Sequence, residues 1–386
     1  MEERPEVVAA SAIPKGGIRP EQILKVLEAL RQASQDLRRS SHDPNSPAIN
    51  ALLELHTEAD TILASYPNLA GLARHLAELK SLIHSIRARN GLRSFLARRR
   101  ASRQVSRLAA SIEAEIQAWI DRESIEELLG LLRDPGGWGG EGRLRSALAA
   151  FEARVSQGFD RELQDLVLRS RVFASLEGVL CEAEGRSKEV REAAAFAVAA
   201  LIGFNKDVFV GEVLMGATVA ALVSTPSVAY FRVLCSLIRC IKSPLVDEIE
   251  FRGGIPKIIA ALGSPDPRIG AAAMDCVLDI GYYGRREAIR AMLREGLMER
   301  LMELQRSEIG GDREGAEREG WAAVMEMRPF ASCVARFAVQ LEVGEGLRQR
   351  EKRGFKMEVL KRVREAALSD AEAANVLAEV LWGSSP

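Results

Sequence analysis

The sequence predicts an all-α protein in which an N-terminal helical bundle precedes a right-handed α-solenoid. Two observations predict this class. Apolar residues recur at the three- and four-residue spacing of a single helix face, and in the second part of the chain similar segments recur at intervals of 40 and 39 residues. The chain has 386 residues, 47% of them hydrophobic, and a formal charge of −1. The hydrophobic content argues against wholesale disorder. The net charge near zero means that the chain as a whole has no positive electrostatic field to attract nucleic acid.

The first part of the chain predicts a mobile arm followed by a bundle. Residues 1–20 carry prolines and an adjacent glycine pair with little periodicity, which is typical of a flexible arm. Residues 21–123 contain helical patterns separated by turn-forming residues, as at Asn90-Gly91, and short connections between helices favour a bundle. The four patterned segments are residues 23–32, 49–63, 69–86 and 105–120.

The second part, residues 124–386, predicts repeats. Ser124 and Glu127 form an S-x-x-E box, which predicts a helix start there. An alanine- or cysteine-rich helix recurs, and small residues allow neighbouring units to approach closely. The last three copies each follow an apolar helix that begins at a glycine (Gly216, Gly254 or Gly296), and a charged insert at 307–320 delays the last copy. The recurring segments are AAAFAVAALIGF (193–204), RVLCSLIRCIKS (232–243), AAAMDCVLDIGY (271–282) and ASCVARFAVQ (331–340).

Two further helices are expected to close the solenoid. In the first, Phe355, Val359 and Val363 form an apolar stripe with basic residues opposite. The second is expected to begin at a capping box formed by Ser369 and Glu372.

The segment GGIPKIIAALGSPDPRIGAAAMDCVLDIG (253–281) resembles the armadillo repeat, in which a G-G-I-P-x-L-V-x-L-L helix precedes an alanine-rich third helix. Residues 124–386 as a whole resemble plant armadillo proteins related to U-box ubiquitin ligases. The resemblance implies an armadillo-type solenoid of about five units, whose third helices line a concave groove. The Cys-Pro-Ile core of a U-box is absent, since Cys181 is the first cysteine, so direct ligase activity is not expected.

No catalytic or cofactor motif is present. The four histidines all precede residue 85, and the sequence lacks HExxH, GxGxxG, GxxxxGK[ST] and GxSxG. We therefore expect a protein that is not an enzyme and has no cofactor and no metal. The five cysteines form no CxxC pair and lie in apolar stretches, which predicts free, buried thiols. The uncharged run 213–231 contains a turn cluster, so two helices are expected there rather than a membrane span.

Two candidate binding surfaces follow. Armadillo proteins that bind nuclear-import-type peptides carry a ladder of asparagines, and the matching positions here are Ala200, Cys240, Asp279 and Arg336. An importin role is therefore disfavoured, and a groove of mixed charge is predicted instead. Its candidate residues are Arg232, Arg239, Asp275, Asp279, Tyr283 and Arg336. The alternative is a groove that binds nothing, whose charges satisfy one another.

The second candidate is the stretch 87–107, which holds eight arginines and no acid. We interpret Arg98, Arg99, Arg100, Arg103 and Arg107 as a patch for an anionic membrane surface or an acidic partner, and we expect them to be exposed. A merely solvated helix face is the alternative. Nucleic acid is disfavoured because few aromatic residues interleave with the charges.

These observations favour a non-catalytic adaptor or scaffold that binds protein partners through an armadillo repeat surface. One alternative is a peripheral membrane protein that uses the arginine stretch. Another is a substrate-recognition subunit in a ubiquitin-ligase pathway. The expected location is the cytoplasm, with the membrane periphery and the nucleus as alternatives.

Overall fold

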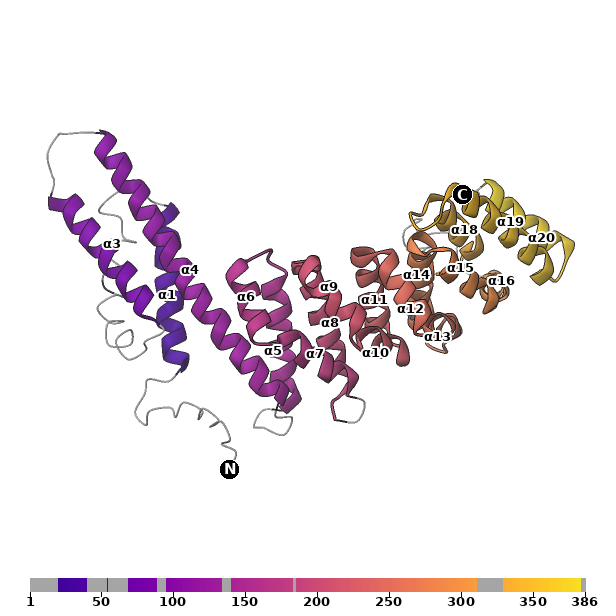
Figure 1. Ribbon diagram of the computed structural model, residues 1–386, viewed down its shortest axis with the longest axis horizontal. Coiled ribbons are helices and arrows are strands. Elements are labelled where there is room, and N and C mark those ends of the chain that lie inside the picture. Colours follow the sequence, from indigo (N-terminus) through magenta and orange to yellow (C-terminus); the bar gives the residue numbers. More distant parts are fainter. Residues whose placement is uncertain are drawn as a thin grey trace, which may run out of the picture. The chain divides into compact units, whose positions relative to one another are not determined.

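The computed structural model describes residues 20–39, 54, 69–88, 95–133, 140–182, 185–310 and 329–382. Every regular element among these residues is a helix (Figure 1). The chain divides into two compact units, Met1–Glu126 and Glu127–Pro386. The predicted arm, most of the predicted helix at 49–63 and most of the charged insert lie outside the described residues.

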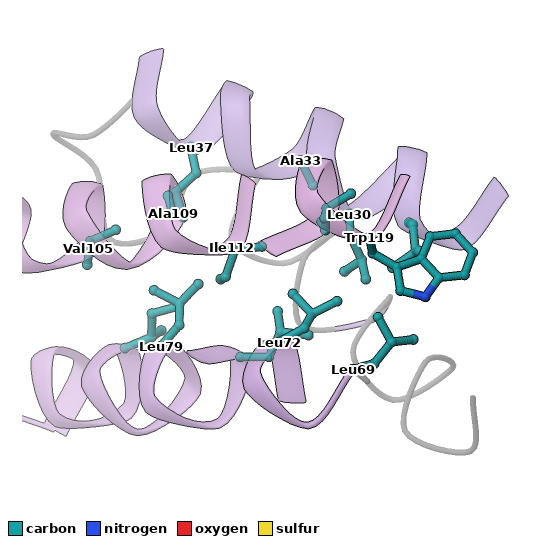
Figure 2. Close-up of a cluster of buried hydrophobic side chains, with 14 of the residues drawn as sticks. Leu30, Ala33, Leu37, Leu69, Leu72, Leu79, Val105, Ala109, Ile112 and Trp119 are labelled. Atoms are coloured by element: carbon teal, nitrogen blue, oxygen red, sulfur yellow. The ribbon is translucent and has the colours of Figure 1, made fainter. Parts of the chain in front are cut away.

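The described helices of the first unit are α1 (Pro20–Arg39), α3 (Ala70–Ala88) and the N-terminal part of α4 (Phe95–Arg133). Each turns one aliphatic face inward, and Figure 2 shows Leu30, Leu72 and Ile112 pointing toward a shared core. Trp119 closes one end of this core and is 5% exposed. Polar contacts at its margin join α1 to α4. Arg38 lies 2.7 Å from Glu113, and Arg31 donates to Gln117.

The predicted helix start at Ser124 is wrong. The helix α4 continues through Ser124 to Arg133. The segment contains no proline, its first glycine is Gly130, and its buried face continues at Ile125 and Leu128. Because nothing interrupts the helical backbone or its apolar stripe, the S-x-x-E pattern sits within the helix and caps nothing.

The second unit consists of successive sets of three helices, as the sequence predicts. The helix α5 (Gly140–Val155) comes before the first complete set. Four sets follow: α6 (Arg161–Arg169), α7 (Val172–Cys181) and α8 (Lys188–Phe204); α9 (Lys206–Met215), α10 (Thr218–Ser224) and α11 (Val228–Ile241); α12 (Ser243–Phe251), α13 (Gly254–Ala261) and α14 (Pro267–Tyr283); α15 (Arg286–Arg294), α16 (Leu297–Gly310) and α18 (Cys333–Val343). The helices α19 (Gln349–Ala366) and α20 (Asp370–Trp382) come last.

Helices in equivalent positions stack on one another. The longest stack contains α5, α8, α11, α14 and α18, each packed against the next (Figure 1). We call these helices the third-helix row. They contain most of each of the four recurring segments singled out in the sequence, and these segments contribute buried alanines, of which Ala194 and Ala273 are inaccessible to solvent. The repeat register predicted from the sequence is therefore confirmed.

Local signals account for the joints between helices. The left-handed backbone required where α12 and α15 end is supplied by Gly253 and Gly296, whose φ angles are 66° and 74°. The Asp266 side chain caps α14 by accepting a hydrogen bond from the Arg268 N–H. The turn cluster in the uncharged run separates α10 from α11, as expected.

The hydropathy of the described helices gives one further result. No single helix among them combines the length and apolar composition needed to cross a bilayer. The helices α9 and α10 meet that test only as a pair, and they are bent by 63° relative to each other.

Candidate recognition surface on the third helices

Charged side chains gather where α11, α14 and α18 lie side by side. The row contributes Arg232 and Arg239 from α11, Asp275 and Asp279 from α14, and Arg336 from α18. We call these five residues the third-helix charge cluster. Asp275 and Asp279 are four residues apart and share one face of α14. Five of the six residues predicted for the groove are thus brought together.

One pair within the cluster is satisfied internally. Arg239 Nε lies 3.1 Å from Asp279 Oδ1 and 3.0 Å from Oδ2. The side chain of Asp279 is only 14% exposed, whereas that of Arg239 is 60% exposed. Burial raises the pKa of Asp279, although the hydrogen bond from Arg239 acts in the opposite direction. For this pair, the alternative in which charges of adjacent repeats satisfy one another is realised.

Asp275 is different. It is solvent-exposed, and within the described part of the chain no hydrogen bond or ion pair to its carboxylate occurs. Burial of part of the side chain raises its pKa above the ordinary value, and the nearby charges of Arg336, Arg239 and Arg232 only partly offset this. A carboxylate that lies among three guanidinium groups without binding any of them is available to a ligand.

The other two residues of the charge cluster, Arg336 and Arg232, differ in their contacts. Arg336 Nη1 donates a hydrogen bond to the Pro329 carbonyl at 2.6 Å, which holds the Arg336 side chain near the start of α18. Arg232 is exposed and makes no hydrogen bond or ion pair with any described residue. Asp275 and Arg232 are therefore one acceptor and one donor of opposite charge on adjacent repeats.

Tyr283, the sixth predicted residue, lies farther along α14. The Lys242 ammonium stands 5.8 Å from the centre of its ring and is 2.7 Å from Glu345. Burial, followed by the charge of Glu345, raises the pKa of Tyr283. It extends the surface toward the end of the helix. Lys242 and Glu345 were missed from the sequence because they are 103 residues apart and come together only in the folded chain.

The arginine stretch is partly described. Arg98 and Arg99 lie in the first turns of α4, but their side chains fall outside the described residues. Arg100, Arg103 and Arg107 are exposed, and their three- and four-residue spacing places them on one helix face. These three side chains are available to an anionic surface, and they belong to the first unit rather than to the repeats.

The cysteines follow the prediction with one correction. All five are free, and Cys235, Cys276 and Cys333 are buried, while Cys240 is intermediate. Burial raises the pKa of the Cys333 thiol to about 12. Cys181, predicted to be buried, is exposed because it is the last residue of α7, where the apolar face ends.

A pocket that the sequence did not indicate lies between α16 and α20. Its volume is about 750 Å³, and its walls include Met302, Val376, Leu368 and Trp382. Because α16 and α20 are far apart in the sequence, no local pattern could have predicted it. Among the described residues, no group of three His, Cys, Asp or Glu side chains is placed to hold a metal ion.

Several solved structures share features of this fold. A designed armadillo repeat protein is 14% identical and matches 68% of this chain and 99% of its own length, with a TM-score of 0.42. Another designed armadillo repeat protein, in complex with the peptide (KR)4, is 15% identical over 67% of this chain and 98% of that one, with a TM-score of 0.39. An engineered protein is 17% identical over 93% of this chain and 77% of that one, with a TM-score of 0.43.

No protein-family model and no curated protein matches the sequence. The class of the protein therefore follows from its own helices. It is an all-α protein whose second unit is an armadillo-type solenoid, built of three-helix sets whose third helices stack in a row.

Proposed function

We propose that the protein is a non-catalytic recognition scaffold that binds a segment of a protein partner on the third-helix charge cluster. One observation carries this proposal. Asp275 and Arg232 are exposed, oppositely charged and unpaired within the described residues, and they lie on adjacent, rigidly packed helices. A rigid surface with charges at fixed spacing suits an extended or helical segment that carries both signs.

The test requires ligands selected against the whole protein. A displayed library of random peptides is enriched on the full chain, and the selected peptides are measured by fluorescence anisotropy. The double reversal Asp275→Lys/Arg232→Glu should weaken binding about tenfold or more, because both charges would then oppose the ligand. This choice is sharper than reversing Asp279 and Arg336, whose existing contacts to Arg239 and Pro329 would be lost as well.

A matched control reverses two exposed charges elsewhere in the solenoid. Asp207 lies on α9 and Lys257 on α13, and both are exposed. Asp207→Lys/Lys257→Glu leaves the net charge unchanged, as the test variant does, and should bind like the unmodified protein. Equal affinity of both double variants, with unchanged thermal unfolding, would move the binding site away from the charge cluster.

A second candidate function is peripheral membrane association through α4. It is favoured by the exposure of Arg100, Arg103 and Arg107 on one helix face. Binding to vesicles that contain phosphatidylserine should fall as salt is added, because screening shortens the range of the field. The absence of co-sedimentation at low salt would remove this candidate.

The finer assignments are proposed from the resemblance stated for residues 124–386. They are a relationship to the plant U-box and armadillo group, a substrate-recognition role beside a ubiquitin ligase, and a cytoplasmic or nuclear location. Affinity capture from plant extract followed by mass spectrometry tests them together. Recovery without any ubiquitin-pathway component would count against the ligase-associated role.

A further inference from the structure

The pocket between α16 and α20 has apolar side chains among its walls, and its polar lining residues include two carboxylates, Glu372 and Glu379. Two of its wall residues are unusually exposed for their type, Leu368 at 77% and Trp382 at 82%. Exposed apolar side chains around a concave site are typical of a surface that receives another protein. The pocket is therefore shaped for an inserted apolar side chain.

The charges around the pocket are not balanced. The helix α20 carries Asp370, Glu372 and Glu379 and no basic residue. Arg306 from α16 pairs with Glu372 at 2.8 Å, and Gln305 donates to Glu379. Asp370 is exposed and has no hydrogen bond or ion pair with the described residues. The net charge of the margin is negative, so it favours an apolar side chain that has cations on either side.

The helix α19 presents that arrangement on its outer face. Arg350, Arg353, Met357, Lys361 and Arg364 follow one another at three- and four-residue intervals, share one face and are all exposed. Met357 stands at the centre and is 66% exposed. Arg350, Arg353 and Arg364 form no ion pair with any described residue, and Lys361 is 3.8 Å from Glu365. We call these five residues the α19 stripe.

The structure thus holds two complementary surfaces in one layer, since α19 packs against both α16 and α20. The α19 stripe and the pocket residues Leu368 and Trp382 are exposed, so both surfaces are accessible to another molecule. We infer that a second copy of this chain supplies it. Met357 of each copy enters the pocket of the other, and the flanking cations meet the acidic margin, so the same contact is made twice about a two-fold axis. Methionine suits this role because its flexible side chain adapts to irregular apolar surfaces.

Sedimentation-velocity ultracentrifugation of the full chain across the micromolar range tests this inference. The expected result is a concentration-dependent dimer. Met357→Asp should weaken the dimer about tenfold or more, because a charge would have to enter the apolar pocket. Met215 on α9 is 88% exposed, so Met215→Asp is the matched control and should leave the dimer unchanged.

A charge exchange identifies the two surfaces more directly. Arg353→Glu/Arg364→Glu alone and Asp370→Arg/Glu379→Arg alone should each be monomeric, because like charges then meet at both contacts. An equimolar mixture of the two variants should recover a dimer, because the altered surfaces complement each other and the unaltered ones still match. A thermal unfolding profile like that of the unmodified chain shows that each variant is folded.

A monomer at every concentration would overturn the inference, as would a dimer that survives Met357→Asp or a charge-exchange mixture that stays monomeric. The readout is oligomeric state alone, so the inference stands or falls independently of ligand binding at the third-helix charge cluster.

Discussion

Asp275 and Asp279 show how strongly a side chain's role depends on its neighbours. They are the same residue type on the same face of α14, separated by about one turn. Asp279 is held by Arg239 and largely covered, whereas Asp275 forms no ion pair with the described residues and is exposed. Burial raises the pKa of both carboxyls. The fold therefore uses Asp279 to join α11 to α14, whereas the charge at Asp275 is unfavourable to folding.

Replacing Asp275 should separate stability from binding. Because its pKa is raised in the folded protein, the folded state binds the proton more tightly than the unfolded chain does. The charged form therefore disfavours folding, and this penalty appears as pH rises through the raised pKa. Asp275→Asn should stabilise the protein at pH 7 while weakening binding of selected peptides. The gain in stability should disappear at pH values below the ordinary pKa of an aspartate side chain, where both states are protonated.

Urea denaturation of both proteins at neutral and acidic pH measures this difference. Asp207→Asn is the control, because it removes an exposed carboxylate on α9, away from the charge cluster. A loss of stability in Asp275→Asn at pH 7 would mean that attraction to the three arginines outweighs the cost of burial.

Among the helices, short elements depend on contacts from neighbouring sets. The seven-residue helix α10 has no side-chain cap of its own. Glu177 on α7 performs that task, because its Oε1 accepts hydrogen bonds from the Ala217 N–H, the Thr218 N–H and the Thr218 hydroxyl at 2.7, 2.9 and 2.8 Å. A carboxylate is well suited to this position, since the first N–H groups of a helix lack partners within it.

Removal of this contact should have a measurable cost. Glu177→Ala is expected to lower the free energy of unfolding by about 0.5–2 kcal/mol, the range typical of a lost helix cap. Glu177→Gln keeps an acceptor oxygen and should cost less. Glu212→Ala on neighbouring α9 removes an exposed carboxylate and serves as the control. Equal denaturation midpoints for Glu177→Ala and Glu212→Ala would contradict the capping role.

The third helices approach one another through small side chains. Ala194 is fully buried, and its helix α8 packs against both α5 and α11. Ala194→Leu should lower the free energy of unfolding by about 1–3 kcal/mol, because a close-packed interface cannot absorb the added methyl groups. Ala272→Leu on α14 should act in the same direction, since Ala272 is 8% exposed. Ala260→Leu is the control for the change in side-chain volume, because Ala260 is exposed on α13. If Ala194→Leu had the same denaturation midpoint as Ala260→Leu, this would argue against the packing described for α8.

At the scale of the whole molecule, the solenoid is held together by contacts between neighbouring sets. The row from α5 to α18 is a succession of adjacent pairs, as are the stacks formed by α7, α10 and α13 and by α9, α12 and α15. Such an architecture distributes stability as a sum of local and nearest-neighbour terms. A local defect should therefore affect nearby sets more than distant ones.

Hydrogen exchange followed by mass spectrometry measures how the effect of a local defect falls with distance along the solenoid. In Ala194→Leu, amide protection should fall most in α8 and its neighbours α5, α7 and α11, and change little in α18 to α20. Protection lost uniformly over the second unit would show that the solenoid opens as one cooperative body instead.

The sequence by itself determined the helices, the repeat register and the buried alanine faces. These depend on residues three or four positions apart, or on one pattern repeated along the chain, so local chemistry suffices. It also placed the charge cluster on the third helices, because a residue's position within the repeat fixes which face of its helix it occupies.

Only the tertiary structure decided which of those charges are paired and that a pocket exists between α16 and α20. Each depends on the distance between side chains from separate helices: Arg239 pairs with Asp279 of the adjacent set, and Met302 and Trp382 line one pocket from positions 80 residues apart. An ion pair or a cavity changes with shifts of a few ångströms between helices. Hydrophobic periodicity determines which face is buried, but it does not set the helix positions that finely.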